Sequence, residues 1–168
     1  IAAQRIDAPV FITGLPRTGT TILHELFAQD PDNRVPQHWE VRFPCPAPET
    51  ASYASDPRIA HAEDELQLWN QIVPEYSAMH ELGARIPVED IQITTHTFVS
   101  DELMGRHIVP SYAAWYASAD KSVAFAFHRR FLQHLQSRHA RKRWVLKSPS
   151  WLGLLPVLFG EYPDARVV

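Results

Sequence analysis

The sequence predicts an α/β domain in which a central parallel sheet lies between layers of helices and carries a largely helical insertion. Three observations favour this three-layer fold. Residues 8–13 are apolar and precede a glycine-bounded loop and an amphipathic stretch, the order that opens a βαβ unit. Two more strand candidates, residues 143–146 and 165–168, enclose a helical stretch near the end. Residues 49–139 have the character of helices.

The first elements follow from short apolar patterns. Residues 8–13 (APVFIT) match a strand that is buried on both faces, as parallel strands are. The helix predicted from Thr20 to Gln29 places four apolar residues on one side, namely Ile22, Leu23, Leu26 and Phe27. Five prolines make residues 30–48 an irregular connection.

Two longer helices are marked by their starts. Asp56 and Pro57 read as an N-cap and a first helical position, and Pro74 ends or kinks that helix. Its apolar stripe comprises Ile59, Ala62, Leu66, Trp69 and Val73. Asp120 opens another amphipathic helix, which carries Ala124, Phe127, Phe131 and Leu135.

Length and composition predict one folded domain. The chain has 168 residues, of which 45% are hydrophobic, and this suffices for a single core. We treat residues 1–168 as one partial domain, with a strand, loop and helix at 10–31, a helical insertion at 49–139, and the second and third core strands within 143–168. Because the last predicted strand stops at the end of the chain, we expect the C-terminal part of the domain to be absent.

Charge and cysteine content narrow the class of protein. The net charge of −3 excludes a general polyanion-binding surface, so nucleic acid is not an expected partner. The single cysteine, Cys45, excludes an internal disulfide and suits a reducing compartment. The sequence shows neither a signal peptide nor an apolar run of membrane-spanning length. We therefore expect a cytoplasmic protein; its oligomeric state is left open.

The loop between the first strand and helix has the outline of a phosphate-binding, P-loop-like turn. The N–H groups at a helix N-terminus and the helix dipole attract anions, and the two glycines let the backbone wrap closely around one. The threonines add hydroxyl donors. The candidate binding residues are Gly14, Leu15, Pro16, Arg17, Thr18, Gly19, Thr20 and Thr21.

The loop departs from the nucleoside triphosphate pattern at one position. Thr20 stands where the Walker motif requires lysine, so a triphosphate would lose its main γ-phosphate contact. Arg17 can reach the same anion as a planar, bidentate donor. Three alternatives remain from the residues alone: an ordinary βα turn, a nucleotide kinase or ATPase, and a non-catalytic module that binds a nucleotide or anion.

Several stretches resemble the sulfotransferase superfamily, and more narrowly the bacterial sulfotransferases and tyrosylprotein sulfotransferases. They are GLPRTGTT, the Trp39-Glu40 pair, WVLKSP and FGEYPDARVV, and the resemblance covers roughly residues 9–48 and 143–168. It implies transfer of a sulfuryl group from 3′-phosphoadenosine 5′-phosphosulfate (PAPS) to a hydroxyl or amine acceptor by in-line displacement, without a metal. The acceptor class is left open among small molecules, lipids, carbohydrates and phenols.

The resemblance also implies roles for two cations. Arg17 and Lys147 would stabilise the phosphosulfate and the leaving oxygen, from the C-terminal edge of the parallel sheet where α/β proteins bind ligands. The site for the 3′-phosphate and the adenine would lie beyond Val168.

The acceptor hydroxyl has to lose a proton, so a general base is expected within hydrogen-bond reach. The PQHWEVRFP stretch offers His38 and Glu40. Counting from the loop arginine favours His38 by the resemblance, whereas residue type favours Glu40, which we prefer. The alternative for Glu40 is an exposed loop glutamate without a catalytic role. His96 is a third candidate, for which helix packing is the preferred interpretation.

Aromatic residues crowd the insertion, and we expect most of them to pack in the core, with some lining an apolar acceptor pocket. They are Trp69, Tyr76, Phe98, Tyr112, Trp115 and Tyr116.

Overall fold

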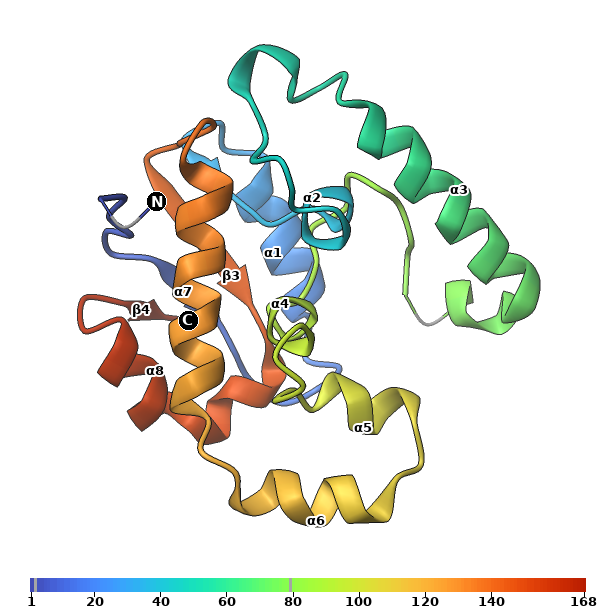
Figure 1. The fold of residues 1–168 in the computed structure, drawn as a ribbon, viewed down its shortest axis with the longest axis vertical. Helices are drawn as coiled ribbons and strands as arrows, with labels where there is room; N and C mark the ends of the chain where they lie inside the picture. Colours follow the sequence, from blue (N-terminus) through green and yellow to red (C-terminus); the bar gives the residue numbers. More distant parts are fainter. Residues whose placement is uncertain (2, 79) are drawn as a thin grey trace.

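The computed structural model describes residues 1, 3–78 and 80–168, and its centre is a four-stranded parallel sheet (Figure 1). The strand order is β2-β3-β1-β4, and every neighbouring pair is parallel. The strands are β1 (Val10–Ile12), β2 (Asn33–Arg34), β3 (Arg143–Lys147) and β4 (Arg166–Val167). The predicted mixed α/β fold with a central parallel sheet is confirmed.

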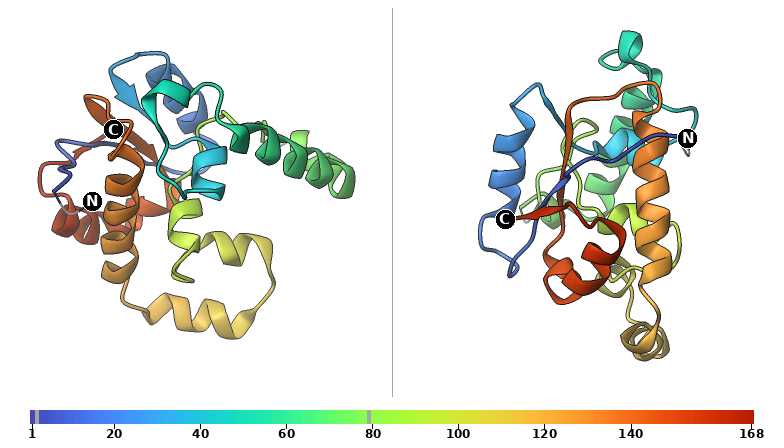
Figure 2. Two further views of the ribbon diagram at one scale, coloured as in Figure 1. Left: turned by 45° about the horizontal axis from the view of Figure 1, so that its top comes forward. Right: turned by 90° about the vertical axis from the view of Figure 1, so that its left-hand side faces the viewer.

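Helices cover both faces of this sheet, with α1 on one face and α7 and α8 on the other (Figure 2). The α-helices are α1 (Thr20–Ala28), α2 (His38–Arg42), α3 (Pro57–Ile72), α4 (Ile91–Thr95), α5 (Glu102–Arg106), α6 (Pro110–Ser118), α7 (Ser122–Gln136) and α8 (Leu155–Glu161). Three 3₁₀-helices complete the elements, η1 (Thr50–Ser52), η2 (Pro74–Ala78) and η3 (Pro149–Leu154). None of the helices in the described part of the chain combines the length and the apolar character needed to cross a bilayer.

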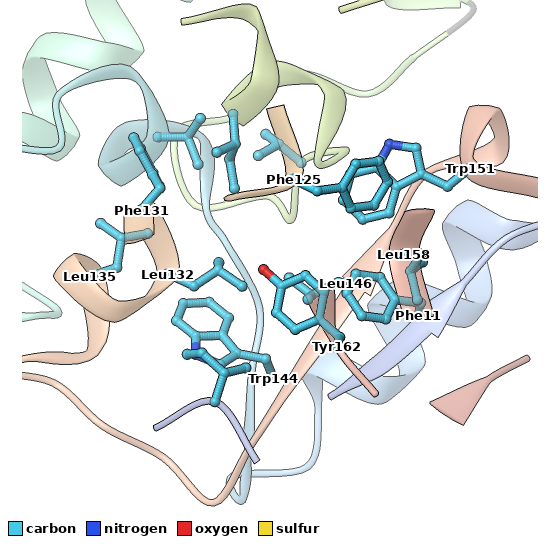
Figure 3. Close-up of a cluster of buried hydrophobic side chains, with 14 residues drawn as sticks. Phe11, Phe125, Phe131, Leu132, Leu135, Trp144, Leu146, Trp151, Leu158 and Tyr162 are labelled. Atoms are coloured by element: carbon cyan, nitrogen blue, oxygen red, sulfur yellow. The ribbon is translucent and has the colours of Figure 1, made fainter. Parts of the chain in front are cut away.

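The core follows the two-residue alternation of the central strands. Phe11 and Leu146 point to the face covered by α7 and α8, where the larger hydrophobic cluster lies (Figure 3). Val10 and Val145 point to the opposite face and pack against α1. Successive side chains of a strand point to opposite faces, so a strand covered by helices on both sides has to be apolar throughout. This is why these strands are continuous apolar runs in the sequence.

The sequence did not predict β2, which pairs Asn33 with Arg143 and Arg34 with Trp144. Its two residues are polar and lie in a stretch interrupted by prolines, so no apolar run marks it. The strand forms because its backbone completes the edge of β3.

Helix α1 faces the sheet differently from the prediction. Leu23 and Phe27 pack on the sheet as expected, but Ile22 and Leu26 are 64% and 63% exposed. Between the two packed residues lies His24, which is buried and bonds the Val145 carbonyl oxygen through Nε2 at 3.1 Å. Only one narrow face of α1 contacts the sheet, and His24, which bonds a backbone carbonyl, is part of that face.

The predicted starts of the two longer helices are confirmed. The Asp56 carboxylate accepts a hydrogen bond from the Arg58 backbone N–H at 3.0 Å, and Pro57 is the first residue of α3. The Asp120 carboxylate accepts one from the Ser122 backbone N–H at 2.9 Å at the start of α7. Each bond satisfies an N–H group that a helix end would leave without a partner.

The aromatic side chains of the insertion are less buried than predicted. Phe98 is 72% exposed and Trp115 is 48% exposed. Helix α6, which the structure describes in full, has no buried residue, since it lies with α5 to one side of the sheet (Figure 1). None of the six aromatic residues named for the insertion, all of which the structure describes, is buried, so the expectation that most of them form core is wrong.

Candidate active site

The ends of β1 and β3 bring the glycine-bounded loop and Lys147 together. Ile12, the last residue of β1, is in register with Lys147, the last residue of β3. The Ser148 backbone N–H then donates to the Ile12 carbonyl oxygen at 3.1 Å. The Lys147 ammonium crosses the gap to α1 and donates to Thr21 Oγ1 at 3.2 Å. The C-terminal edge of the sheet thus holds a buried cation beside the loop.

The loop itself is exposed and leads into the first turn of α1. Gly19 is the N-cap of α1 and has φ +91°, a conformation that suits glycine. Arg17 also has positive φ, at 66°, which is uncommon for a residue with a side chain and concentrates at functional sites. Thr18 Oγ1 donates to the Leu15 carbonyl oxygen at 2.6 Å and closes the turn. Pro16, in the middle of this turn, is exposed, and Gly14 and Thr20, at the two ends of the loop, are half-buried.

The loop and Lys147 combine features that generally attract anions. The residues from Leu15 to Gly19 are exposed, so the loop is accessible, and the first N–H groups of α1 lack partners within the helix. Lys147 supplies a charge that is 5% exposed, where an electrostatic interaction is screened less than in water. Among the described residues, His, Cys, Asp and Glu side chains do not gather into a group of three that could hold a metal ion.

An acidic residue that the sequence did not single out completes the site. Glu89 forms an ion pair with Lys147 through Oε1, and its side chain is 26% exposed. The adjacent Asp90 donates its backbone N–H to the Lys147 carbonyl oxygen at 2.9 Å. No sequence motif marks Glu89, because tertiary contacts alone bring residues 87–90 to the end of β3.

Asp90 begins a buried polar group behind Lys147. Its carboxylate lies 3.7 Å from His128 Nε2, and His128 Nδ1 bonds the Tyr162 hydroxyl at 2.8 Å. Burial raises the pKa of Asp90 to about 6, against the opposing effect of His128. The group ties α7 and α8 to the segment that carries Glu89.

His24 is a buried residue of α1 that contacts the central strand β3. Burial lowers its pKa to about 4, more than the bond to the Val145 carbonyl raises it, and the Lys147 charge lowers it further. The imidazole is therefore neutral at neutral pH and does not repel the Lys147 charge.

Lowering the pH from 7 to 4 is expected to destabilise the protein through His24. The folded pKa is lower than the value of 6.5 in the unfolded chain, so its contribution is complete above 6.5 and is lost as the pH falls toward 4. The loss corresponds to about 3 kcal/mol. Urea unfolding at both pH values should show His24→Gln losing about 3 kcal/mol less than the wild type. His107→Gln, at an exposed histidine, serves as the control, and equal losses in all three proteins would contradict the assignment.

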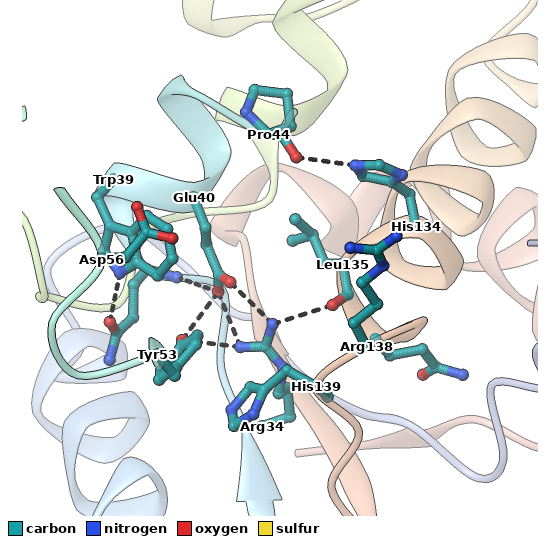
Figure 4. A network of polar contacts seen from close by, with 12 residues as sticks. Arg34, Trp39, Glu40, Pro44, Tyr53, Asp56, His134, Leu135, Arg138 and His139 are labelled. Carbon is teal, nitrogen blue, oxygen red and sulfur yellow. Dashed lines mark hydrogen bonds and ion pairs between the residues drawn. The ribbon is translucent and has the colours of Figure 1, made fainter. Parts of the chain in front are cut away.

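Glu40 is not the exposed loop residue that one interpretation expected. It belongs to α2 and is fully buried, with Arg34 Nη1 and Nη2 at 2.9 and 2.8 Å from its two carboxylate oxygens (Figure 4). The Tyr53 hydroxyl and the Gln37 backbone N–H also donate to Oε1, at 3.2 and 3.1 Å. The carboxylate therefore holds β2, α2 and Tyr53 together.

His38 is half-buried at the start of α2, and its backbone N–H donates to the Ile86 carbonyl oxygen at 3.1 Å. Burial and then the Arg42 charge lower its pKa. Glu65, Arg106 and Glu63 also act on this pKa, with smaller and partly opposing effects. His96 contacts the Val41 carbonyl oxygen at 3.2 Å and stacks on Phe131, as expected for a packing histidine.

The fold and this site define an α/β protein with a glycine-bounded loop at the start of its first helix and a buried cation beside that loop. The chain belongs to the Sulfotransferase family, which it matches over residues 9–168. It is similar to the crystal structure of sulfotransferase STF9 from Mycobacterium avium, with a TM-score of 0.86 and 32% identity over 99% of this chain and 43% of that one. Sulfotransferase STF1 from Mycobacterium tuberculosis H37Rv gives a TM-score of 0.83 and 36% identity over 97% of this chain and 45% of that one.

The chain therefore spans less than half the length of either solved structure. No curated protein matches it significantly. The resemblance to bacterial sulfotransferases, inferred from the loop and the WVLKSP stretch, is confirmed at the level of the family.

Proposed function

We propose that this chain carries the phosphosulfate-binding part of a sulfotransferase that moves a sulfuryl group from PAPS to a hydroxyl or amine acceptor by in-line displacement. The observation that supports it most directly is the hydrogen bond from Lys147 to Thr21, at the edge of the sheet where β1 and β3 end. The family match covers both strands and the loop. When bound, PAPS supplies a sulfuryl group on a phosphate oxygen that leaves during transfer.

The residues of the chain then have separate tasks. The N–H groups and hydroxyls of residues 14–21 hold the phosphosulfate, as helix N-termini hold anions. Arg17 and Lys147 stabilise the negative charge that develops on the leaving oxygen. Lys147 is held by Thr21 and Glu89 before the reaction, so it can act with little reorganisation. The fold thus contributes mainly orientation and electrostatic stabilisation, as in phosphoryl transfer.

In this proposal the proton acceptor belongs either to α2 or to residues 84–90. The candidates in these two segments are His38, Glu40 and Glu89. Burial and four hydrogen bonds withdraw Glu40 from contact with an acceptor in this conformation, so we give Glu40 the task of holding α2 in place. His38 and Glu89 remain accessible. Cys45 is a free, exposed thiol, which supports a reducing compartment such as the cytoplasm as the place of action.

Calorimetric titration of the complete protein tests the donor. Adenosine 3′,5′-bisphosphate (PAP), the desulfonated product, is expected to bind at least about tenfold more tightly than ATP with Mg²⁺, since the loop lacks the lysine that a triphosphate requires. Release or transfer of labelled sulfate from PAPS separates an enzyme from a non-catalytic module. Tighter binding of ATP would favour a kinase or ATPase, and PAP binding without any sulfuryl transfer would favour a module that only binds.

A further inference from the structure

We propose that Glu89 is the proton acceptor of the sulfuryl transfer. This inference rests on the function proposed above and assigns one of its steps to a residue. The first observation is position. The Glu89 carboxylate contacts the Lys147 ammonium, which in turn donates to Thr21 at the first turn of α1. Glu89 therefore lies directly beside the cation that contacts the first turn of α1.

The backbone on both sides of Glu89 is fixed. The Val88 N–H donates to the Pro36 carbonyl oxygen at 2.9 Å, and the Asp90 N–H donates to the Lys147 carbonyl oxygen at 2.9 Å. Gln37 and Pro87 form an isolated antiparallel bridge in the same place. One anchor leads to α2 and the other to β3. A carboxylate on such a support keeps its position relative to the cation, which general base catalysis requires.

The carboxylate is also available to a second molecule. Within the described part of the chain, Lys147 is its one hydrogen-bonding partner, and the side chain is 26% exposed. Glu40, by contrast, is fully buried and accepts four hydrogen bonds. Glu89 and Arg106 both act on the pKa of Tyr76, which burial chiefly raises.

His38 differs from Glu89 in the groups around it. Within the described part of the chain, no hydrogen bond or ion pair joins the His38 side chain to Lys147, whose partners are Thr21 and Glu89. Glu89, on the other hand, touches Lys147 directly. A base has to lie beside the acceptor oxygen while the cation lies beside the donor, so the residue in contact with the cation is the better placed of the two.

The proposed step balances without a further reactant. The acceptor O–H bond breaks and its proton moves to a carboxylate oxygen of Glu89. The acceptor oxygen forms the new bond to sulfur, and the bond from sulfur to the phosphate oxygen breaks. The electron pair of that bond remains on the phosphate oxygen, where Lys147 and Arg17 stabilise its charge.

The test compares Glu89→Gln with wild type in the complete protein, using acceptors that differ in their need for a base. Water and 1-propanol must lose a proton, whereas 4-nitrophenol is largely ionised at mildly alkaline pH. Release of labelled sulfate from PAPS measures transfer to water whatever the natural acceptor is. We expect transfer to water and 1-propanol to fall roughly 10²–10⁴-fold, and transfer to 4-nitrophenolate to fall less than tenfold.

Binding of PAP, measured by calorimetry, gives a readout that does not depend on turnover. Because Glu89→Gln removes a negative charge beside the anion site, PAP is expected to bind as tightly as in wild type or more tightly. Glu89→Asp keeps the carboxylate and should retain part of the rate. Glu49→Gln is the matched control, since Glu49 is an exposed glutamate paired with Arg138 and lies away from the loop.

Several results would overturn the inference. Equal losses for all acceptors, together with weaker PAP binding, would show that Glu89 acts only by positioning Lys147. Unchanged rates in Glu89→Gln would exclude it from the chemistry. The acceptor-dependent pattern in His38→Ala instead would assign the base to His38. A wild-type protein that neither binds PAP nor releases sulfate would contradict the proposed function itself, which is a separate outcome.

Discussion

Replacing Lys147 by alanine is expected to lower sulfuryl transfer from PAPS roughly 10²–10³-fold, the loss typical when one positioned donor to a developing charge is removed. The Lys147 side chain is 5% exposed and reaches Thr21 at the start of α1. A cation in this surrounding is screened less than one in water, so no solvent ion can replace it fully. Arg17→Ala is expected to have an effect of the same order, because Arg17 lies in the loop itself.

The control for both variants is Lys142→Ala. Lys142 precedes β3 at the opposite end of the sheet and pairs with Asp32 at 3.2 Å. Its removal should leave the rate near that of wild type. Melting temperatures of the three variants, measured alongside the rates, separate loss of chemistry from loss of fold. Near-normal transfer in both Lys147→Ala and Arg17→Ala would refute the roles proposed for these cations.

Breaking the buried pair of Arg34 and Glu40 is expected to cost about 3–5 kcal/mol of unfolding free energy. Glu40→Ala leaves the Arg34 guanidinium buried, where it is 2% exposed, without the carboxylate that neutralises it. Tyr53 and the Gln37 N–H lose the same acceptor. For a domain of this size the loss corresponds to a fall of roughly 6–20 °C in melting temperature.

The exposed pair of Arg42 and Glu65 supplies a matched comparison. Glu65→Ala should cost no more than about 1 kcal/mol, because surface ion pairs contribute little. A cost below about 1 kcal/mol for Glu40→Ala would contradict the structural role assigned to Glu40. Glu40→Gln then tests its chemistry: a stable variant with full PAP binding but no transfer would restore Glu40 as the base.

The sequence predicts the parts of the fold whose cause is local. Residues 10–12 and 144–146 are apolar because both faces of the sheet are covered. The Asp56 side chain caps α3, and the Asp120 side chain accepts a hydrogen bond from the N–H of Ser122, the first residue of α7. The loop is likewise visible as a spacing of glycines and threonines. These features could be inferred because neighbouring residues alone produce them.

The remaining features depend on contacts between distant segments. Strand β2 exists only as the partner of β3, and the buried side of α1 is decided by His24 and its bond to Val145. Glu40 reads as an accessible acid in the sequence, because nothing in the local pattern shows that it forms a buried ion pair with Arg34. Glu89 contacts Lys147 over a separation of 58 residues. Local sequence patterns do not indicate such pairings, so the sequence predicted Lys147 as a site residue but not its partner Glu89.

Helix α6 contributes no buried side chain to the body of the protein. Substitutions on its surface should therefore cost little unfolding free energy, whereas the sheet is constrained by packing on both of its faces. The surface residues of α6 can therefore change during evolution while the sheet and the loop stay the same. Such changes would alter the surface of the protein at almost no cost in folding stability.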